Sequence, residues 1–121
     1  MKSNDSVILV KSKDFALHII DLYKHLCYEE KEFVISKQLL RCGTSIGANA
    51  REASFAQSKA DFIAKLSISL KESGETEYWL ELLLESRYIS KEQFDVVYYK
   101  NKELIKIITS IIKTTKTNNY R

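Results

Sequence analysis

The sequence predicts an all-α fold, an antiparallel up-down-up-down four-helix bundle. Three observations indicate this class: the 121 residues include no proline, they include only three glycines, and long stretches repeat apolar residues with the period of a helix. Hydrophobic residues make up 45% of the chain and charged residues 29%, which suits amphipathic helices around one core. We therefore expect one domain that needs neither metals nor disulfides to bury its core.

The domain boundaries follow from where the apolar period starts and stops. Residues 1–11 lack a stable period and are predicted to form an N-terminal arm. Residues 12–113 are predicted to form the four-helix bundle. Residues 114–121 are rich in Thr, Lys and Asn and are predicted to form a flexible basic tail.

Short polar segments separate the predicted helices. The helices are expected to run from Ser12 or Asp14 to Tyr28, from residues 33–36 to 54–55, from Lys59 to Arg87, and from Ser90 through Ile112. Ser58 followed by Asp61 is typical of a capped helix start. Ser90 followed by Gln93 has the pattern of a capping box. Because the connections are short, neighbouring helices are expected to run antiparallel.

The second predicted helix carries polar and very small residues where a helix normally presents bulk. Its apolar stripe includes Asn49, and Gly43 and Gly47 lie beside that stripe. Each glycine costs roughly 1 kcal/mol relative to alanine within a helix, which favours a packing role in close helix contact. We predict a structural polar seam between the second and third helices, formed by Ser45, Asn49, Glu52 and Glu75, with Arg41 or Arg51 as the nearest cationic partners. The alternative is that most of the carboxylates in this region, Glu52, Glu72, Glu75 and Glu77, are exposed.

No catalytic, cofactor or metal motif is present in the sequence. His18 and His25 are seven residues apart and share a helix face, but helical metal pairs are spaced by three or four. We therefore predict no enzyme activity, no cofactor and no small-molecule substrate. No apolar run is long enough to span a membrane, and the isolated thiols of Cys27 and Cys42 favour a reducing compartment, so a cytoplasmic location is expected.

The positive charge is concentrated near the C-terminus. The whole chain carries a formal charge of +3, whereas residues 100–121 contain six basic residues and one acidic residue. The candidate nucleic-acid contacts are Lys100, Lys102, Lys106, Lys113 and Lys116. The alternative is a solvated basic helix face. Tyr78 and Trp79 are candidate subunit-interface residues, with a role for Trp79 in the subunit core as the alternative.

Three segments carry a family resemblance. They are the run from Gln38 to Glu52 with its Ser-Ile-x-Ala-Asn-x-x-Glu pattern, the triplet Asp61-Phe62-Ile63, and the run from Ser69 to Leu80 with its Glu-Thr-x-Tyr-Trp-Leu ending. Over residues 12 to 112 the chain resembles the bacterial four-helix-bundle proteins named for intervening sequences in large-subunit ribosomal RNA genes.

The resemblance implies an up-and-down bundle that assembles into a ring-like homo-oligomer, a pentamer. It also implies kinship with the accessory proteins of diversity-generating retroelements, which are basic pentameric barrels that bind nucleic acid. The sequence departs from those proteins because it is only slightly basic and its third helix is acidic. The function predicted first is a non-enzymatic homo-oligomeric scaffold whose partner is a second copy of itself. The alternative is an RNA- or DNA-binding protein that uses the lysine-rich fourth helix and tail.

Overall fold

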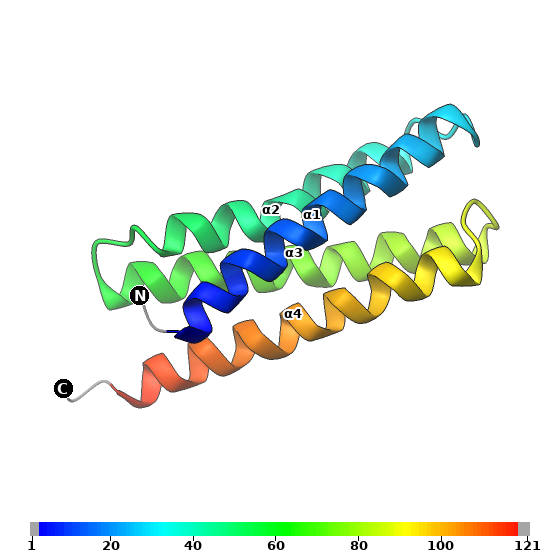
Figure 1. The fold of residues 1–121 in the computed structure, drawn as a ribbon. Helices are drawn as coiled ribbons and strands as arrows, with labels where there is room; N and C mark the ends of the chain where they lie inside the picture. The colour runs from blue at the N-terminus through cyan, green and yellow to red at the C-terminus, as the bar shows by residue number, and fades with distance from the viewer. Residues whose placement is uncertain (1–2, 119–121) are drawn as a thin grey trace.

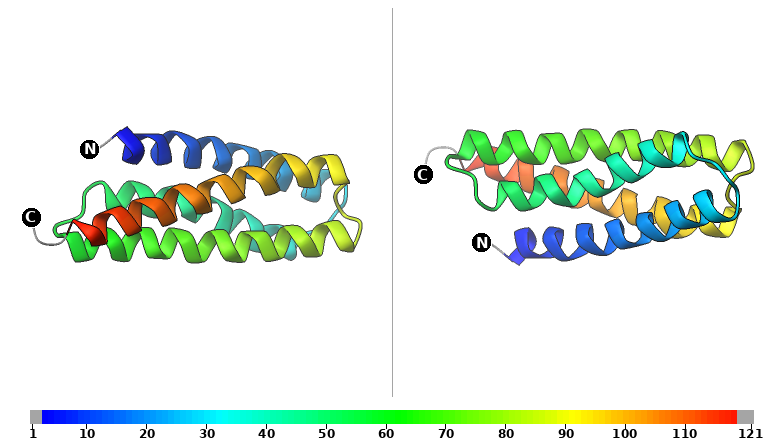
Figure 2. Two further views of the ribbon diagram at one scale, coloured as in Figure 1. Left: turned by 90° about the horizontal axis from the view of Figure 1, so that it is seen from below. Right: turned by 90° about the horizontal axis from the view of Figure 1, so that it is seen from above.

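The computed structural model describes residues 3–118 and confirms an all-α four-helix bundle. The helices are α1 (Ser3–Tyr28), α2 (Ile35–Ala53), α3 (Lys59–Glu85) and α4 (Lys91–Thr117). They run alternately up and down, so that the α1–α2 and α3–α4 connections lie at one end and the α2–α3 connection at the other (Figure 1, Figure 2). Each helix packs against two neighbours in the cyclic order α1, α2, α3, α4.

Large aliphatic side chains from all four helices fill the centre of the bundle. The fully buried ones include Phe15, Ile19, Leu26, Leu39, Ile46, Leu66, Leu80, Leu83, Leu104 and Ile108. Their spacing of three and four residues places them on one stripe of each helix, so burial of apolar surface drives the packing. Within residues 3–118, no helix combines the length and apolar character needed to cross a membrane.

The predicted N-terminal arm is wrong over its described part. The first helix begins at Ser3, and Ile8 is buried in the core. The apolar stripe of α1 extends backward from Phe15 through Ser12 to Ile8, but the serine interrupts the hydrophobic pattern and hides the period. The helix therefore continues through a buried serine, which lies against Gly47 of α2, to the buried Ile8.

The predicted tail is also shorter than expected. Helix α4 continues to Thr117, beyond the predicted domain end at residue 113, because Ile111 is buried and Thr115 bonds back to the carbonyl oxygen of that residue at 2.7 Å. Residues 119–121 of the predicted tail, like residues 1–2 of the arm, lie outside the described residues.

Both predicted helix caps are confirmed. The Ser58 hydroxyl accepts a hydrogen bond from the Asp61 backbone N–H at the start of α3. Ser90 and Gln93 form a reciprocal capping box at the start of α4. At the end of α3, Arg87 adopts a left-handed backbone with φ of 69°, so that the next N–H bonds back to the carbonyl oxygen of Leu83 at 2.9 Å.

Helix α2 is capped by a side chain that the sequence pattern did not identify. The carboxylate of Glu32 accepts hydrogen bonds from the backbone N–H groups of Val34, Ile35 and Ser36, at 3.2, 3.0 and 2.7 Å. The Ser36 hydroxyl donates in turn to the carbonyl oxygen of Glu32 at 2.8 Å. A carboxylate at a helix N-terminus satisfies unpaired donors and interacts favourably with the helix dipole.

The close approach predicted for the α2 glycines occurs, and it is to α1. A Cβ added at Gly43 would lie 2.8 Å from Cγ1 of Ile19, and one added at Gly47 would lie 3.1 Å from Oγ of Ser12. A side chain at position 43 would therefore clash with α1, and one at position 47 would be tighter than an ordinary contact. Gly74 differs, because an added Cβ there would meet nothing within 4 Å, and α3 runs through it without a break.

Candidate functional site

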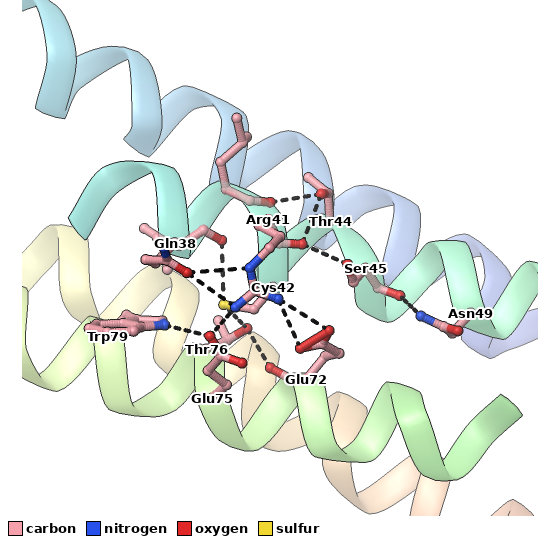
Figure 3. Close-up of polar contacts among 12 residues, drawn as sticks. Gln38, Arg41, Cys42, Thr44, Ser45, Asn49, Glu72, Glu75, Thr76 and Trp79 are labelled. Carbon is pink, nitrogen blue, oxygen red and sulfur yellow. Dashed lines mark hydrogen bonds and ion pairs between the residues drawn. The ribbon is translucent and has the colours of Figure 1, made fainter. Parts of the chain in front are cut away.

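A polar cluster lies on the surface where α2 meets α3, and Arg41 is its centre (Figure 3). The Arg41 guanidinium pairs with Glu72 at 3.4 Å and with Glu75, both on α3. Its Nε and Nη2 atoms also donate to the side-chain oxygen of Gln38 at 3.3 Å. Glu72 and Glu75 are three residues apart and so project from the same side of α3 toward α2. The arginine thus ties one helix to two points of the other.

Glu75 joins this cluster to the aromatic residues of α3. Its carboxylate accepts a hydrogen bond from Nε1 of Trp79 at 2.9 Å while it pairs with Arg41. The Trp79 ring is half-buried and packs against the core. Tyr78 beside it is exposed and meets the Trp79 ring edge to face, with centroids 5.2 Å apart. The two predicted interface residues therefore differ, because Tyr78 projects outward and Trp79 is held against its own subunit.

The carboxylates of the cluster favour the charged form of Arg41. Partial burial lowers the pKa of the Arg41 guanidinium, but Glu75 and Glu72 outweigh that effect and leave it above its ordinary value. Beneath the cluster, burial raises the pKa of the Cys42 thiol to about 11, although the Thr76 hydroxyl donates to it at 3.2 Å. The thiol is therefore protonated at neutral pH, which leaves it a poor nucleophile.

The predicted polar seam does not form as one group. The Ser45 hydroxyl donates to the carbonyl oxygen of Arg41 at 2.7 Å, and the Asn49 amide donates to the carbonyl oxygen of Ser45 at 2.9 Å, so both bond within α2. Glu52 is exposed and pairs with Lys65 at 3.1 Å. Serine and asparagine side chains are short enough to bond to the preceding helical turn, which competes with contacts to a neighbouring helix.

Buried polar contacts between helices come instead from residues that the seam prediction omitted. The Ser69 hydroxyl of α3 donates to the carbonyl oxygen of Ile46 at 2.8 Å. The Asn101 amide of α4 donates to the carbonyl oxygen of Ser73 at 3.0 Å. Ser69 and Ser73 are four residues apart within an otherwise apolar stripe, which is the sequence signal that could have identified them.

The five lysines predicted to contact nucleic acid divide into two groups. Lys100 pairs with Asp14 at 3.2 Å, and Lys102 pairs with Glu77 at 2.7 Å. The hydrogen bond with Glu77 is the main cause that raises the pKa of Lys102. The remaining three are exposed and have no ion-pair partner within the described part of the chain: Lys106, Lys113 and Lys116.

Both histidines contact residues that are close to them in the sequence. Nδ1 of His18 lies 3.0 Å from the carbonyl oxygen of Asp14, and Nε2 of His25 lies 3.8 Å from the carboxylate of Glu30. Among residues 3–118, no three His, Cys, Asp or Glu side chains gather in a way that could hold a metal ion.

The geometry defines a class of protein before any relative is considered: an antiparallel four-helix bundle whose surface polar groups hold helices together. The chain belongs to the 23S rRNA-intervening sequence protein family, whose model matches residues 4–110. It is also similar to a crystal structure from Bacteroides thetaiotaomicron, described as a protein with unknown function from the S23 ribosomal protein family. That structure shares 57% sequence identity with a TM-score of 0.90, over 91% of this chain and 98% of the other.

These comparisons confirm the family predicted from the three sequence segments and the all-α bundle. Neither the family description nor the similar structure indicates an enzymatic activity. A comparison with curated proteins finds no match.

Proposed function

We propose that the protein is a non-enzymatic, homo-oligomeric scaffold that works in the cytoplasm. The observation that carries this proposal is the number of large apolar side chains left exposed on regular helices. They include Val7, Val10, Leu17, Ile68, Tyr78, Val96 and Tyr99. Val10 and Leu17 share one face of α1, and exposed apolar side chains that gather on one face favour association with another protein surface. Five subunits is the number that the family resemblance implies.

The α2–α3 polar cluster supports a structural role. Both of its carboxylates pair with Arg41, and one of them also accepts a hydrogen bond from Trp79. A general base needs a lone pair directed at a substrate, and a nucleophile needs an activating base. The Cys42 thiol is buried and its pKa is raised, so it is not activated as a nucleophile. Free buried cysteines are also consistent with a reducing compartment such as the cytoplasm.

Light scattering coupled to size-exclusion chromatography at micromolar concentration tests this proposal. We expect a discrete mass five times the 14.0 kDa subunit, independent of dilution over this range. A mass of one subunit at every concentration would contradict the scaffold proposal. A discrete mass of another multiple would correct only the subunit number.

Nucleic-acid binding is the second candidate function, and the three unpaired lysines of α4 favour it. Lys106, Lys113 and Lys116 are exposed on the C-terminal half of α4, where they add positive charge to one region. Phosphate contacts through such lysines release counterions, so binding should weaken steeply as salt rises. By contrast, Lys100 and Lys102 are already neutralised by Asp14 and Glu77.

Fluorescence anisotropy with a labelled structured RNA, measured across a salt series, tests this candidate. Replacing the three lysines with glutamine should weaken binding and reduce the salt slope by about three. The matched control replaces three exposed lysines elsewhere, Lys13, Lys31 and Lys37, with the same loss of charge. Equal effects of both triple variants would indicate only a general charge effect, and no binding at low salt would remove the candidate.

A further inference from the structure

The outward face of α3 carries mostly small residues and is the first of two features that point to a specific contact. The residues on this face are Ala60, Ala64, Ser67, Lys71, Gly74 and Tyr78, spaced alternately by about four and three. All six are exposed. Gly74 has no neighbour within 4 Å of an added Cβ, unlike the two glycines of α2. A glycine in mid-helix costs roughly 1 kcal/mol relative to alanine, and no contact within the subunit explains it.

The outward face of α1 has the opposite character. Val10 is 70% exposed and Leu17 is 54% exposed, although both lie within a regular helix. They are seven residues apart, so they project in nearly the same direction. Val7 is exposed on the same side. This face therefore presents protruding apolar side chains at the same seven-residue spacing that separates Ser67 from Gly74 on α3.

Contacts through α2 establish which residues of α1 and α3 lie at the same height in the bundle. Ser12 of α1 lies against Gly47, and the adjacent Ile46 accepts a hydrogen bond from Ser69 of α3. Ser12 and Ser69 are therefore at nearly the same height.

A second set of contacts, seven residues further along α1, gives the same relation between α1 and α3 residue numbers. Ile19 lies against Gly43, and the adjacent Cys42 is bonded by Thr76 of α3. In both sets the α3 residue number exceeds the α1 residue number by 57. Because α1 and α3 run in the same direction, this relation holds along the bundle.

We infer that α1 of one subunit packs with its outward face on the outward face of α3 of a second copy of this chain. The inference rests on the proposed homo-oligomer and names the faces that form it. A second copy placed beside the first at equal height brings Val10 opposite Ser67 and Leu17 opposite Gly74. Large side chains thus meet small ones, which allows two helices to approach closely.

The charges on the two faces are complementary at this same register. Lys24 of α1 comes opposite Glu81 of α3, and Asp14, which also pairs with Lys100 of its own subunit, comes opposite Lys71. Neither Lys24 nor Lys71 has an ion-pair partner within the described residues. Opposite charges facing each other favour the correct partner and orientation. Each copy uses two different faces, so the contact is heterologous, and it gives a closed ring when the rotation between neighbouring copies closes.

Disulfide trapping tests the pairing directly. The double variant Leu17→Cys/Gly74→Cys should form a ladder of covalent multimers under mild oxidation, seen on non-reducing gels. The native thiols Cys27 and Cys42 are buried and stay out of this reaction. Each single variant should give no ladder, because a heterologous contact never brings two copies of one position together. A covalent dimer from Gly74→Cys alone would show α3 meeting α3 and would overturn the inference.

A steric variant and a charge swap provide independent measurements. Gly74→Leu points into open space in the subunit, so helix content by circular dichroism should be unchanged while the mass falls to one subunit. Ser110→Leu, at an exposed position of α4, is the matched control and should stay oligomeric. Lys24→Glu should weaken association about tenfold or more, and adding Glu81→Lys should restore it.

The outcomes separate the inference from the function on which it rests. A wild-type protein that is monomeric overturns both. An oligomeric wild type overturns only the proposed contact if Gly74→Leu stays oligomeric and the double-cysteine variant gives no ladder. If Gly74→Leu loses helix content, the double-cysteine variant decides. A ladder then supports the contact, and an oligomer without a ladder overturns the contact.

Discussion

The side-chain amide of Asn101 on α4 donates a hydrogen bond to the backbone carbonyl oxygen of Ser73 on α3, 3.0 Å away, and both residues are fully buried. The remaining polar atoms of the same pair, Oδ1 of Asn101 and Oγ of Ser73, have no hydrogen-bond partner in the described part of the chain. A buried polar atom without a partner costs free energy, whereas the hydrogen bond contributes some. One contact therefore contains both a stabilising and a destabilising element.

This asymmetry predicts opposite effects for two serines on α3. Ser73→Ala removes an unpartnered buried hydroxyl and should raise the free energy of unfolding by about 1 kcal/mol. Ser69→Ala, four residues earlier, removes the hydrogen bond to Ile46 and should lower it by about 0.5 to 1 kcal/mol. Urea unfolding followed by circular dichroism measures both, and a larger loss for Ser73→Ala than for Ser69→Ala would contradict the assignment.

The cap formed by Glu32 predicts that a residue in a connection matters as much as a core residue. Glu32→Ala leaves the first N–H groups of α2 without their acceptor and should lower the free energy of unfolding by about 1 to 3 kcal/mol. Glu29→Ala changes a neighbouring exposed glutamate and should alter stability by less than about 0.5 kcal/mol. Thermal or urea unfolding measures both variants. Equal losses in the free energy of unfolding would refute the cap.

The close contact between α1 and α2 predicts a coupled pair of substitutions. Gly43→Ala places a methyl group 2.8 Å from the Ile19 side chain and should lower the free energy of unfolding by about 1 to 3 kcal/mol. Ile19→Ala alone should cost about 2 to 5 kcal/mol. The double variant should lose less than the sum, because shortening the isoleucine makes room for the methyl group. Additive losses would mean that the glycine is required for another reason.

The Cys42 thiol predicts a pH dependence of stability with a definite sign. Its pKa is raised by burial from 9.0 to about 11, so the folded state holds the proton more tightly than the unfolded state. The associated stability is fully present below about pH 9 and is lost as the pH rises through about 11. Cys42→Ala lacks this contribution, so its stability deficit relative to wild type should shrink between about pH 8 and about pH 10.5. A deficit that grows with pH would reverse the sign.

The sequence was sufficient for the fold because apolar periodicity and capping residues are local signals. Ser58 and Ser90 mark helix starts through contacts within three residues, so the pattern located both. The same reasoning failed at the N-terminus. Ser12 interrupts the stripe of α1, and it is buried there because it lies against Gly47 of another helix while its hydroxyl donates to the carbonyl oxygen of Leu9.

The candidate site was less accessible to sequence reasoning because it depends on how two helices are rotated. Glu75 was assigned to a polar contact, and it does pair across helices, with Arg41. Ser45 and Asn49 were expected to do the same, but their bonds stay within α2. A periodic pattern shows which residues share a helix face, yet a rotation of a few tens of degrees decides whether a short side chain reaches the neighbouring helix.

Trp79 is the chain's only tryptophan, and its indole N–H is bonded to the carboxylate that also pairs with Arg41. Its ring packs against the core and meets the ring of the exposed Tyr78. The intrinsic fluorescence of the protein is therefore a label-free reporter of this one place. In the proposed oligomer, a shift in emission wavelength on dilution would follow dissociation of subunits near Tyr78. A larger shift in denaturant would follow separation of the two helices.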